Sequence, residues 1–249
     1  MNSDPRKGAR IGVLVPFTNT NLEPDMMLMC ATDMTLHFQR MGGYDVCEIP
    51  GSDQMAGMGA SDITYDLRMI SGARPDVVLY GCTSATLTHG SDFDADLARK
   101  IKAGSDAICF TAAGSLVAGI KSLDVKSIGL SSPYLGKINL QAVDFLASNG
   151  IQTVKRVDIG RELSNYGQGE LTPDEVYDLA VRADHPEAEA IVLSCTDMRS
   201  VEEIERIEAT LDKPVVTSNQ AMMFCLMRAL KIPRHDDVPG RLFHRLEEI

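Results

Sequence analysis

Two short stretches of this chain share one pattern, and that pattern limits what the chain can fold into. Val77–His89 reads V-V-L-Y-G-C-T-S-A-T-L-T-H, and Ala190–Asp197, much further along, reads A-I-V-L-S-C-T-D. Each is an apolar run typical of a buried strand, followed by a small residue and then Cys-Thr. Cys82 and Cys195 therefore occupy equivalent places just past the carboxyl ends of two predicted strands, where open α/β sheets bind ligands.

Strand and helix patterns alternate along the whole chain, which favours an α/β fold with parallel sheets. The two Cys-Thr units suggest a duplicated half, and no flexible linker or low-complexity segment separates the halves. We predict two similar α/β lobes, residues 1–115 with 218–249 and residues 116–217, with the active site in the cleft between them. The last predicted helix, Asn219–Leu230, returns to the first lobe.

The remaining cysteines fit a simpler role. Free cysteine is among the most buried residue types and usually serves as inert packing. Cys30, Cys47, Cys109 and Cys225 are assigned to that role. Cys82 and Cys195 are not, because two copies of strand, small residue and Cys-Thr indicate two thiols that face one small substrate.

Charge and composition exclude several classes of function. The 249 residues carry 24 Lys and Arg against 35 Asp and Glu, a formal net charge of −11, which argues against nucleic acid or an anionic membrane as a partner. No apolar run approaches the roughly 20 residues of a membrane span, and Met1–Arg10 lacks the apolar core of a signal peptide, so we predict a cytoplasmic protein. Six cysteines without tight spacing indicate reduced thiols, and no Cys/His cluster predicts a metal site.

Two thiols on opposite faces of a carbon can move a proton, or one can add to an activated double bond. The pKa of a cysteine falls near a helix N-terminus, and a helix is predicted after each thiol, so we expect a lowered thiol pKa. Negative charge then builds on a carboxylate or carbonyl, which needs hydrogen-bond donors around it. The candidate donors are Thr18, Asn19, Thr83, Ser84, Tyr134 and Thr196. No cofactor is required, and the chain has no GxGxxG or phosphate-binding loop.

Several local expectations concern the surroundings of the thiols. The polar loop Phe17–Asn21 follows the first strand and is either a ligand loop or a self-capped turn; the helix after it is expected to run to Met34. Met55–Gly59 is expected to be a flexible loop, either an ordinary surface loop or a lid. Ser200 is expected to open a helix through a capping box with Glu203, and the tail from Pro233 to pack loosely.

A cysteine–histidine hydrolase is the competing enzyme. His89 follows Cys82 within the same stretch, in the helix expected there. The other histidines, which have no motif around them, are His37, His185, His235 and His244. A solvated or capping role fits each of the five. One Cys-His pair would also leave the second Cys-Thr copy unexplained.

At these residues the chain resembles the aspartate/glutamate racemase superfamily and, within it, the maleate cis–trans isomerase branch. The resemblance covers nearly the whole chain and has four anchors: Val15–Pro24 (V-P-F-T-N-T-N-L-E-P), Gly81–Ser84 (G-C-T-S), Ser132–Tyr134 (S-P-Y) and Ser194–Thr196 (S-C-T). It implies two Rossmann-like lobes, a site without a cofactor, a small carboxylate substrate and a homodimer.

The resemblance also implies roles for single residues. Cys82 matches the cysteine that attacks the alkene of maleate, giving a succinyl-cysteine intermediate whose central bond can rotate. Cys195 matches the cysteine that handles the proton on the neighbouring carbon. The substrate-holding residues match Asn19, Tyr134 and Asn165. The chain departs from these isomerases at Phe17-Thr18, where they have Ser-Ser, and at Thr83, where the racemases also have threonine.

Three functions follow as hypotheses. The first is an isomerase of a small dicarboxylate, with maleate to fumarate as the best single reaction. The second is an amino-acid or hydantoin racemase that uses the two thiols as a proton-transfer pair. The third is a small-acid-binding protein without turnover. A related decarboxylase is disfavoured because arylmalonate decarboxylases typically use one cysteine, and the presence of both cysteines favours catalysis over binding alone.

Overall fold

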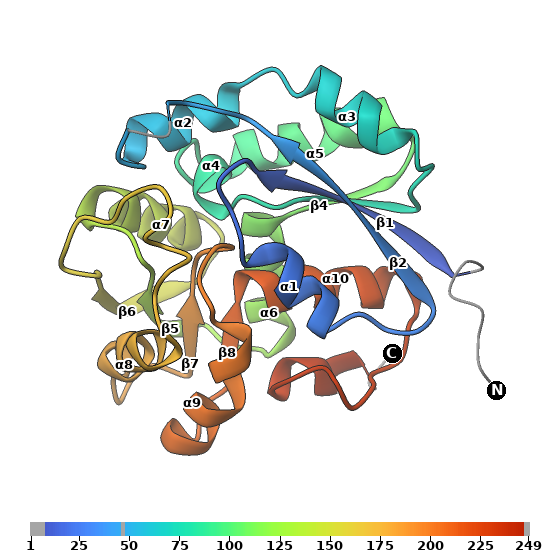
Figure 1. Cartoon of the computed structure of the whole chain (residues 1–249). Helices are drawn as coiled ribbons and strands as arrows, with labels where there is room; N and C mark the ends of the chain where they lie inside the picture. The colour runs from blue at the N-terminus through green and yellow to red at the C-terminus, as the bar shows by residue number, and fades with distance from the viewer. Residues whose placement is uncertain (1–7, 46–47, 247–249) are drawn as a thin grey trace.

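The computed structural model describes residues 8–45 and 48–246, and within them two parallel sheets stand side by side (Figure 1). The first sheet has the order β2-β1-β3-β4, with β1 at Ala9–Pro16, β2 at Met34–Met41, β3 at Val77–Tyr80 and β4 at Ile108–Thr111. The second has the order β6-β5-β7-β8, with β5 at Ser127–Ser131, β6 at Gln152–Val157, β7 at Ala190–Leu193 and β8 at Val215–Thr217. All pairs within each sheet are parallel.

Helices connect the strands and cover the sheets. The first half of the chain contains α1 (Leu22–Leu28), α2 (Ser52–Ala60), α3 (Thr64–Ser71), α4 (Thr83–Leu87), α5 (Ser91–Ser105) and α6 (Ala112–Ser122). The second half contains α7 (Gly136–Ser148), α8 (Pro173–Ala183), α9 (Ile204–Leu211) and α10 (Ser218–Leu230), with the 3-10 segments η2 (Val201–Glu203) and η3 (Arg241–Leu246). The predicted fold class, two similar α/β lobes with parallel sheets, is confirmed.

The sheet order explains why the two Cys-Thr units are equivalent. β3 is third in the order of the first sheet, and β7 is third in the order of the second. Both strands are fully buried and consist of apolar residues only, Val77–Tyr80 and Ala190–Leu193. Continuous apolar runs are typical of strands that are covered on both faces. Cys82 and Cys195 thus follow matching strands of two matching sheets.

α10 lies between the two halves of the molecule. It packs against α6 and also contacts α1, β4 and β8 (Figure 1). The strands of the first sheet fall within residues 9–111 and those of the second within 127–217. The lobe boundaries themselves, 1–115 with 218–249 and 116–217, stay a prediction.

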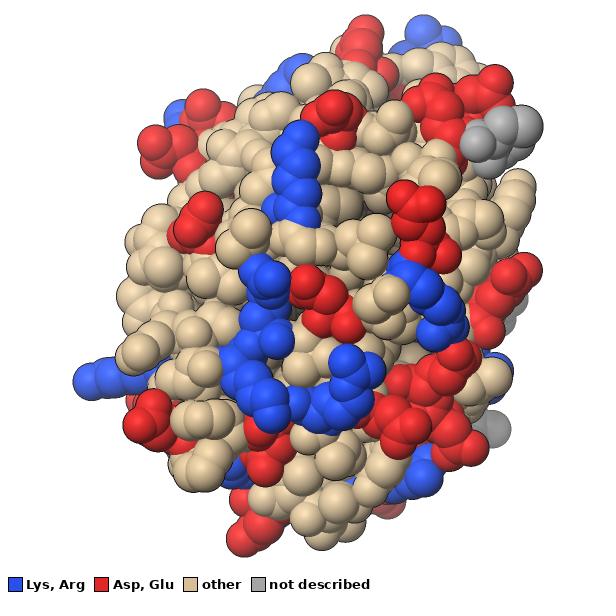
Figure 2. Space-filling model, turned by 90° about the vertical axis from the view of Figure 1, so that its left-hand side faces the viewer, with Lys and Arg blue, Asp and Glu red and all other residues tan. Residues whose placement is uncertain are grey.

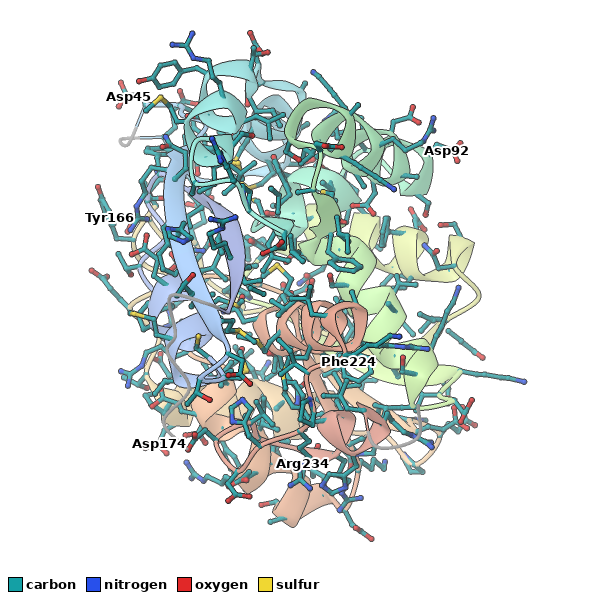
Figure 3. The ribbon with its side chains drawn as sticks, turned by 90° about the vertical axis from the view of Figure 1, so that its right-hand side faces the viewer. Asp45, Asp92, Tyr166, Asp174, Phe224 and Arg234 are labelled. Carbon is teal, nitrogen blue, oxygen red and sulfur yellow. The ribbon has the colours of Figure 1, made fainter. Side chains whose placement is uncertain are left out.

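The expectation of a loosely packed tail is wrong. After α10 the chain folds back, and Val238, Leu242 and Phe243 are buried. Phe243 packs edge-to-face on Phe224 of α10, with 6.2 Å between the ring centroids; Figure 3 looks onto this side and labels Phe224. The polar residues from Pro233 onward hid these apolar anchors, because their spacing matches neither a helix nor a strand.

Three further local expectations are wrong. Met55–Gly59 is part of the helix α2, and Met55, Met58 and Gly59 are buried in it. α1 ends at Leu28 instead of Met34, because the chain must turn to enter β2. Ser200 forms no side-chain cap on η2, and its hydroxyl is buried. Cys47 and residues 1–7 of the segment Met1–Arg10 lie outside the described residues.

Candidate active site

Close packing at the end of β3 fixes the position of Cys82. A Cβ atom on Gly81 would lie 2.8 Å from the carbonyl oxygen of Leu14 and 2.3 Å from a methyl carbon of Leu22. Only glycine fits there, so the chain passes close to β1 before it turns. Cys82 follows in an extended conformation as the N-cap residue of α4, and it is 5% exposed.

Hydrogen bonds fix the position of Cys195 at the end of β7. The backbone N–H of Ser194 donates to the carbonyl of Ser131 on β5 at 2.9 Å. Cys195 follows and is 1% exposed. The backbone N–H of Asp197 donates to Cys195 Sγ at 3.3 Å, and the thiol donates to Gln168 Oε1 at 3.7 Å. The sulfur is therefore held between its own loop and the segment that contains Gln168.

Two hydroxyl groups connect the thiols. Tyr134 Oη lies 3.4 Å from Cys195 Sγ and 3.1 Å from Ser84 Oγ. Ser84 Oγ lies 3.8 Å from Cys82 Sγ and 2.9 Å from Met55 Sδ on α2. The order along this chain of polar atoms is Cys82, Ser84, Tyr134, Cys195, and each member is buried. The two thiols predicted to face one substrate are therefore brought together, with two predicted donors between them.

Asn19 and Thr196 join the two Cys-Thr loops. Asn19 Nδ2 donates to Thr196 Oγ1 at 3.1 Å, and that hydroxyl donates to the carbonyl of Gly81 at 2.9 Å. Asn19 Oδ1 accepts from the backbone N–H groups of Asn21 and Leu22 at the start of α1. The loop after β1 is thus an ordered connection between the lobes, and Asn19 is part of it.

The other predicted donors have different contacts. Thr83 Oγ1 donates to Ser218 Oγ at 2.9 Å, at the start of α10. Asn165 Oδ1 accepts from Tyr44 Oη at 2.7 Å, and Asn165 Nδ2 donates to the carbonyl of Glu48 at 2.6 Å. Thr18 is 8% exposed in the loop after β1. The structure places Asn165 with residues that follow β2, whereas Ser84 and Tyr134 contact the sulfur atoms.

Burial dominates the protonation of both thiols. It raises the pKa of Cys82, although the backbone N–H groups of Ala85 and Ser84 and the Ser84 hydroxyl act in the opposite direction. Burial, with the Asp197 carboxylate as the next contribution, raises the pKa of Cys195 to about 12. The expectation of a lowered thiol pKa is therefore wrong, because desolvation outweighs the helix start.

Tyr134 and His89 differ in the roles that their surroundings allow. Burial raises the pKa of Tyr134 well above its usual range, so the phenol stays a hydrogen-bond donor. His89 Nε2 lies 2.8 Å from the carbonyl of Ala56, and its ring stacks on Phe93. These contacts give His89 a structural role and argue against a Cys-His pair.

Three neighbours of the site, Gln168, Tyr44 and Asp197, are not among the predicted site residues. Gln168 accepts the Cys195 thiol hydrogen, Tyr44 Oη donates to Asn165 Oδ1, and Asp197 Oδ1 accepts from the backbone N–H groups of Thr20 and Asn21. Asp197 directly follows the second Cys-Thr, which is a signal that the sequence did offer. Gln168 and Tyr44 lie in polar loops without a motif.

Within residues 8–45 and 48–246, no group of three or more His, Cys, Asp or Glu side chains is arranged to hold a metal ion. In the same part of the chain, no helix combines the length and the apolar character needed to cross a membrane.

Comparison with known proteins places the chain in a family. The family model described as arylmalonate decarboxylase matches residues 11–243. The chain belongs to this family. It is also 27% identical to a maleate isomerase of Nocardia farcinica (strain IFM 10152) over 95% of this chain and 96% of the relative, and 25% identical to that of Geobacillus stearothermophilus over 95% and 97%. The resemblance to maleate isomerases and the prediction of an isomerase-class enzyme are confirmed.

A solved structure confirms the fold. The Nocardia farcinica maleate cis–trans isomerase, as a mutant with a covalently bound succinylcysteine intermediate, superposes with a TM-score of 0.84 at 24% identity. The match covers 94% of this chain and 98% of that chain. The two proteins therefore share both lobes and their arrangement.

Proposed function

We propose that the protein isomerises a small cis-dicarboxylate to its trans form, with maleate to fumarate as the reference reaction, through a covalent bond to Cys82. The observation that carries the proposal is the buried row of polar atoms from Cys82 through Ser84 and Tyr134 to Cys195. It offers a nucleophile, an acid and two hydroxyl donors within one row of contacts. The Nocardia relative, with its succinylcysteine, supports the same chemistry.

The surroundings of the thiols assign their roles. Attack requires Cys82 as the thiolate, and the N–H groups of Ser84 and Ala85 with the Ser84 hydroxyl offset part of the burial cost of that charge. Cys195 lies beside the Asp197 carboxylate, which holds the proton on sulfur. Cys82 is therefore the nucleophile, and Cys195 is the acid.

The steps balance without a cofactor. The Cys82 sulfur forms a bond to one alkene carbon, and the π electrons move toward the neighbouring carbon and its carboxylate. The Cys195 thiol gives its proton to that carbon. The former double bond is now single and rotates. Cys195 then takes the proton back, the C–S bond breaks, and the trans alkene leaves with both cysteines restored.

The hydroxyl groups of Tyr134 and Ser84 stabilise the negative charge that develops on the substrate carboxylate. Tyr134 and Ser84 lie between the sulfurs, so their O–H groups can turn from each other to a bound carboxylate. Donors fixed in a buried site stabilise such charge more than water does. Asn19 keeps the two Cys-Thr loops in register, and its second amide hydrogen is available to the substrate.

Intact-protein mass spectrometry after incubation with maleate tests the proposal. We expect Cys195→Ser to gain the mass of one maleic acid, because water slowly supplies the proton that completes the adduct and serine cannot readily take it back. Cys82→Ala should gain none. Cys225→Ala, which removes a buried thiol on α10, is the matched control and should isomerise maleate like the unchanged protein. An adduct on any cysteine other than Cys82 would contradict the assigned nucleophile.

Racemisation of an amino acid or hydantoin is the second candidate, because the same two thiols can remove and return a proton at one carbon. It predicts exchange of the α-hydrogen of such a substrate with solvent deuterium and no loss of maleate absorbance.

The homodimer implied by the resemblance stays a prediction, which light scattering on the purified protein checks.

A further inference from the structure

A pocket of about 140 Å³ has two neighbours of the second thiol in its wall. Tyr134 and Gln168 form part of its wall, and these two side chains also contact Cys195 Sγ, at 3.4 and 3.7 Å. The inner end of the pocket is therefore one side chain away from the atom proposed to handle the substrate proton. Ser84 and Tyr134 lie between the pocket and Cys82.

The pocket has an apolar lining from three segments of the chain. The aliphatic and proline side chains in its wall are Ile49, Pro50, Pro133, Leu135, Ile138 and Leu163. Ile49 is 50% exposed and Leu135 is 40% exposed, so apolar surface faces solvent at the mouth. A ligand group that covers this surface would gain hydrophobic free energy.

The charged residues of the wall do not call for a charged group. Lys137 pairs with Asp53 at 3.0 Å, and Arg161 pairs with Glu175. Both cations are exposed at the rim. The wall segments lie on the side of the molecule shown in Figure 2, where Lys and Arg side chains gather among Asp and Glu. Because both cations are paired and Glu162 is also part of the wall, the charges do not favour an anionic group in the pocket, and its apolar interior suits a hydrocarbon.

We propose that the preferred substrate is a cis-butenedioate with an apolar substituent, a branched alkyl or phenyl group, which this pocket holds. This inference rests on the proposed function and narrows its substrate class. The size agrees, because an aliphatic cavity of about 150 Å³ binds benzene. Unsubstituted maleate leaves the pocket to water.

The position of the pocket also fixes which carbon bears the substituent. Because two wall residues, Tyr134 and Gln168, contact Cys195 Sγ, we place the substituted carbon on the Cys195 side, so that Cys82 attacks the unsubstituted carbon. The π electrons then move to the substituted carbon, and the Cys195 thiol gives its proton there. Rotation and the reverse steps release the substituted trans isomer with both thiols restored.

Competing substrates test the inference. We would measure kcat/KM for maleate, 2-methylmaleate, 2-isobutylmaleate and 2-phenylmaleate by the loss of absorbance of each cis isomer. We expect kcat/KM for 2-isobutylmaleate to exceed that for maleate by about tenfold or more, since one well-placed methylene in an apolar pocket is worth about that factor. Turnover of maleate with an equal or lower value for every substituted compound would overturn the inference and leave the proposed function intact.

Matched substitutions test whether the preference for substituted substrates arises in the pocket. Leu163→Trp fills the pocket from the loop side, so the ratio of kcat/KM for 2-isobutylmaleate to that for maleate should fall to about one or less. Leu140→Trp is the control, because Leu140 lies on α7, is 54% exposed and is not part of the wall. Leu135→Trp at the exposed mouth gives a second filled pocket if Leu163→Trp does not fold.

Two results with these variants and substrates would overturn the inference. One is an unchanged ratio in both filled variants, which would place the substituent elsewhere. The other is the absence of isomerisation of any cis compound, with CO2 release from 2-phenylmalonate instead, which would overturn the proposed function as well. With the first result, isomerisation of the substituted compounds is still measured. Failure of the pocket inference can therefore be told apart from failure of the proposed function.

Discussion

Replacing Asp25 by asparagine tests the electrostatics behind the second thiol loop. Asp25 on α1 is 6% exposed, and its Oδ2 accepts from Asn219 Nδ2 at 2.7 Å. The same amide donates to the carbonyl of Thr196, next to Cys195, at 3.0 Å. Burial raises the pKa of the Asp25 carboxyl from 3.8 to about 7. Glu202 and Asp197 add to this rise, and Asn219 and Arg199 oppose it.

The direction of the effect follows from proton binding. The folded state holds the Asp25 proton more tightly than the unfolded state, so folding is favoured at low pH and stability is lost as pH rises from 3.8 to about 7. Each unit of pKa shift corresponds to about 1.4 kcal/mol, so a shift of about three units corresponds to about 4 kcal/mol. About 2 kcal/mol of this loss is present at pH 5 and the rest by pH 8.

Asp25→Asn keeps an acceptor for Asn219 and removes the charge. We expect the free energy of unfolding of the variant, relative to the unchanged protein, to increase by about 2 kcal/mol between pH 5 and pH 8. Urea unfolding at both pH values measures this difference. Asp53→Asn is the control, because the Asp53 side chain is 88% exposed. Equal differences for Asp25→Asn at the two pH values, or a variant less stable at pH 8 than at pH 5 relative to the unchanged protein, would refute the reasoning.

Three other perturbations have defined outcomes. Tyr134→Phe should lower kcat for maleate by about 10²-fold or more, as for a lost oxyanion donor, with thermal unfolding as the check that the fold is kept. Phe243→Ala should lower the free energy of unfolding by about 3–5 kcal/mol, measured by urea titration, because the tail packs on Phe224. Because burial raises the pKa of the Cys82 thiol, kcat/KM for maleate should rise about tenfold per pH unit from pH 6 to pH 8, and a flat profile would contradict a thiolate nucleophile.

The strands that carry the thiols could be predicted residue by residue. β3 at Val77–Tyr80 and β7 at Ala190–Leu193 coincide with the apolar runs that precede the two Cys-Thr pairs. Each is a short apolar run, rich in β-branched residues, between residues that favour turns, and such runs have few alternatives in an α/β protein. The fold class followed from these runs and the helices between them.

The helix α2 could not be predicted, and its case shows why. Met55–Gly59 contains two glycines, which favour loops in isolation. In the fold, a Cβ on Gly59 would lie 2.1 Å from the carbonyl oxygen of Ala85 on α4, so the glycine permits close helix contact. Met55 then reaches Ser84. The helix is formed by contacts with a segment distant in sequence, and local propensity does not contain them.

The same limit applies to the wall of the site. Gln168 and Tyr44 lie in loops whose composition indicates only surface turns. Their contacts, with Cys195 and Asn165 respectively, join residues that are 27 and 121 positions apart in the sequence. The sequence identifies groups that follow strand ends, because sheet order fixes those positions. It does not identify loop residues that reach them from the side.

The two Cys-Thr units look alike in sequence but differ in chemistry, and the difference lies in the residues after each threonine. After Cys82 the chain enters α4 at once, so the N–H groups of Ser84 and Ala85 lower the pKa of its thiol against the effect of burial. After Cys195 the chain continues into Asp197, whose carboxylate is the next cause after burial that raises the pKa of Cys195; at Cys82 the same carboxylate also raises the pKa but ranks behind the Ala85 N–H and the Ser84 hydroxyl. Isomerisation needs a thiolate that attacks one alkene carbon and a thiol that keeps its proton for the neighbouring carbon. The difference between the surroundings of Cys82 and Cys195 fits these two roles. Two-base racemisation also needs one thiolate and one protonated thiol, so loss of maleate and exchange of an α-hydrogen with deuterium are the measurements that separate the two reactions.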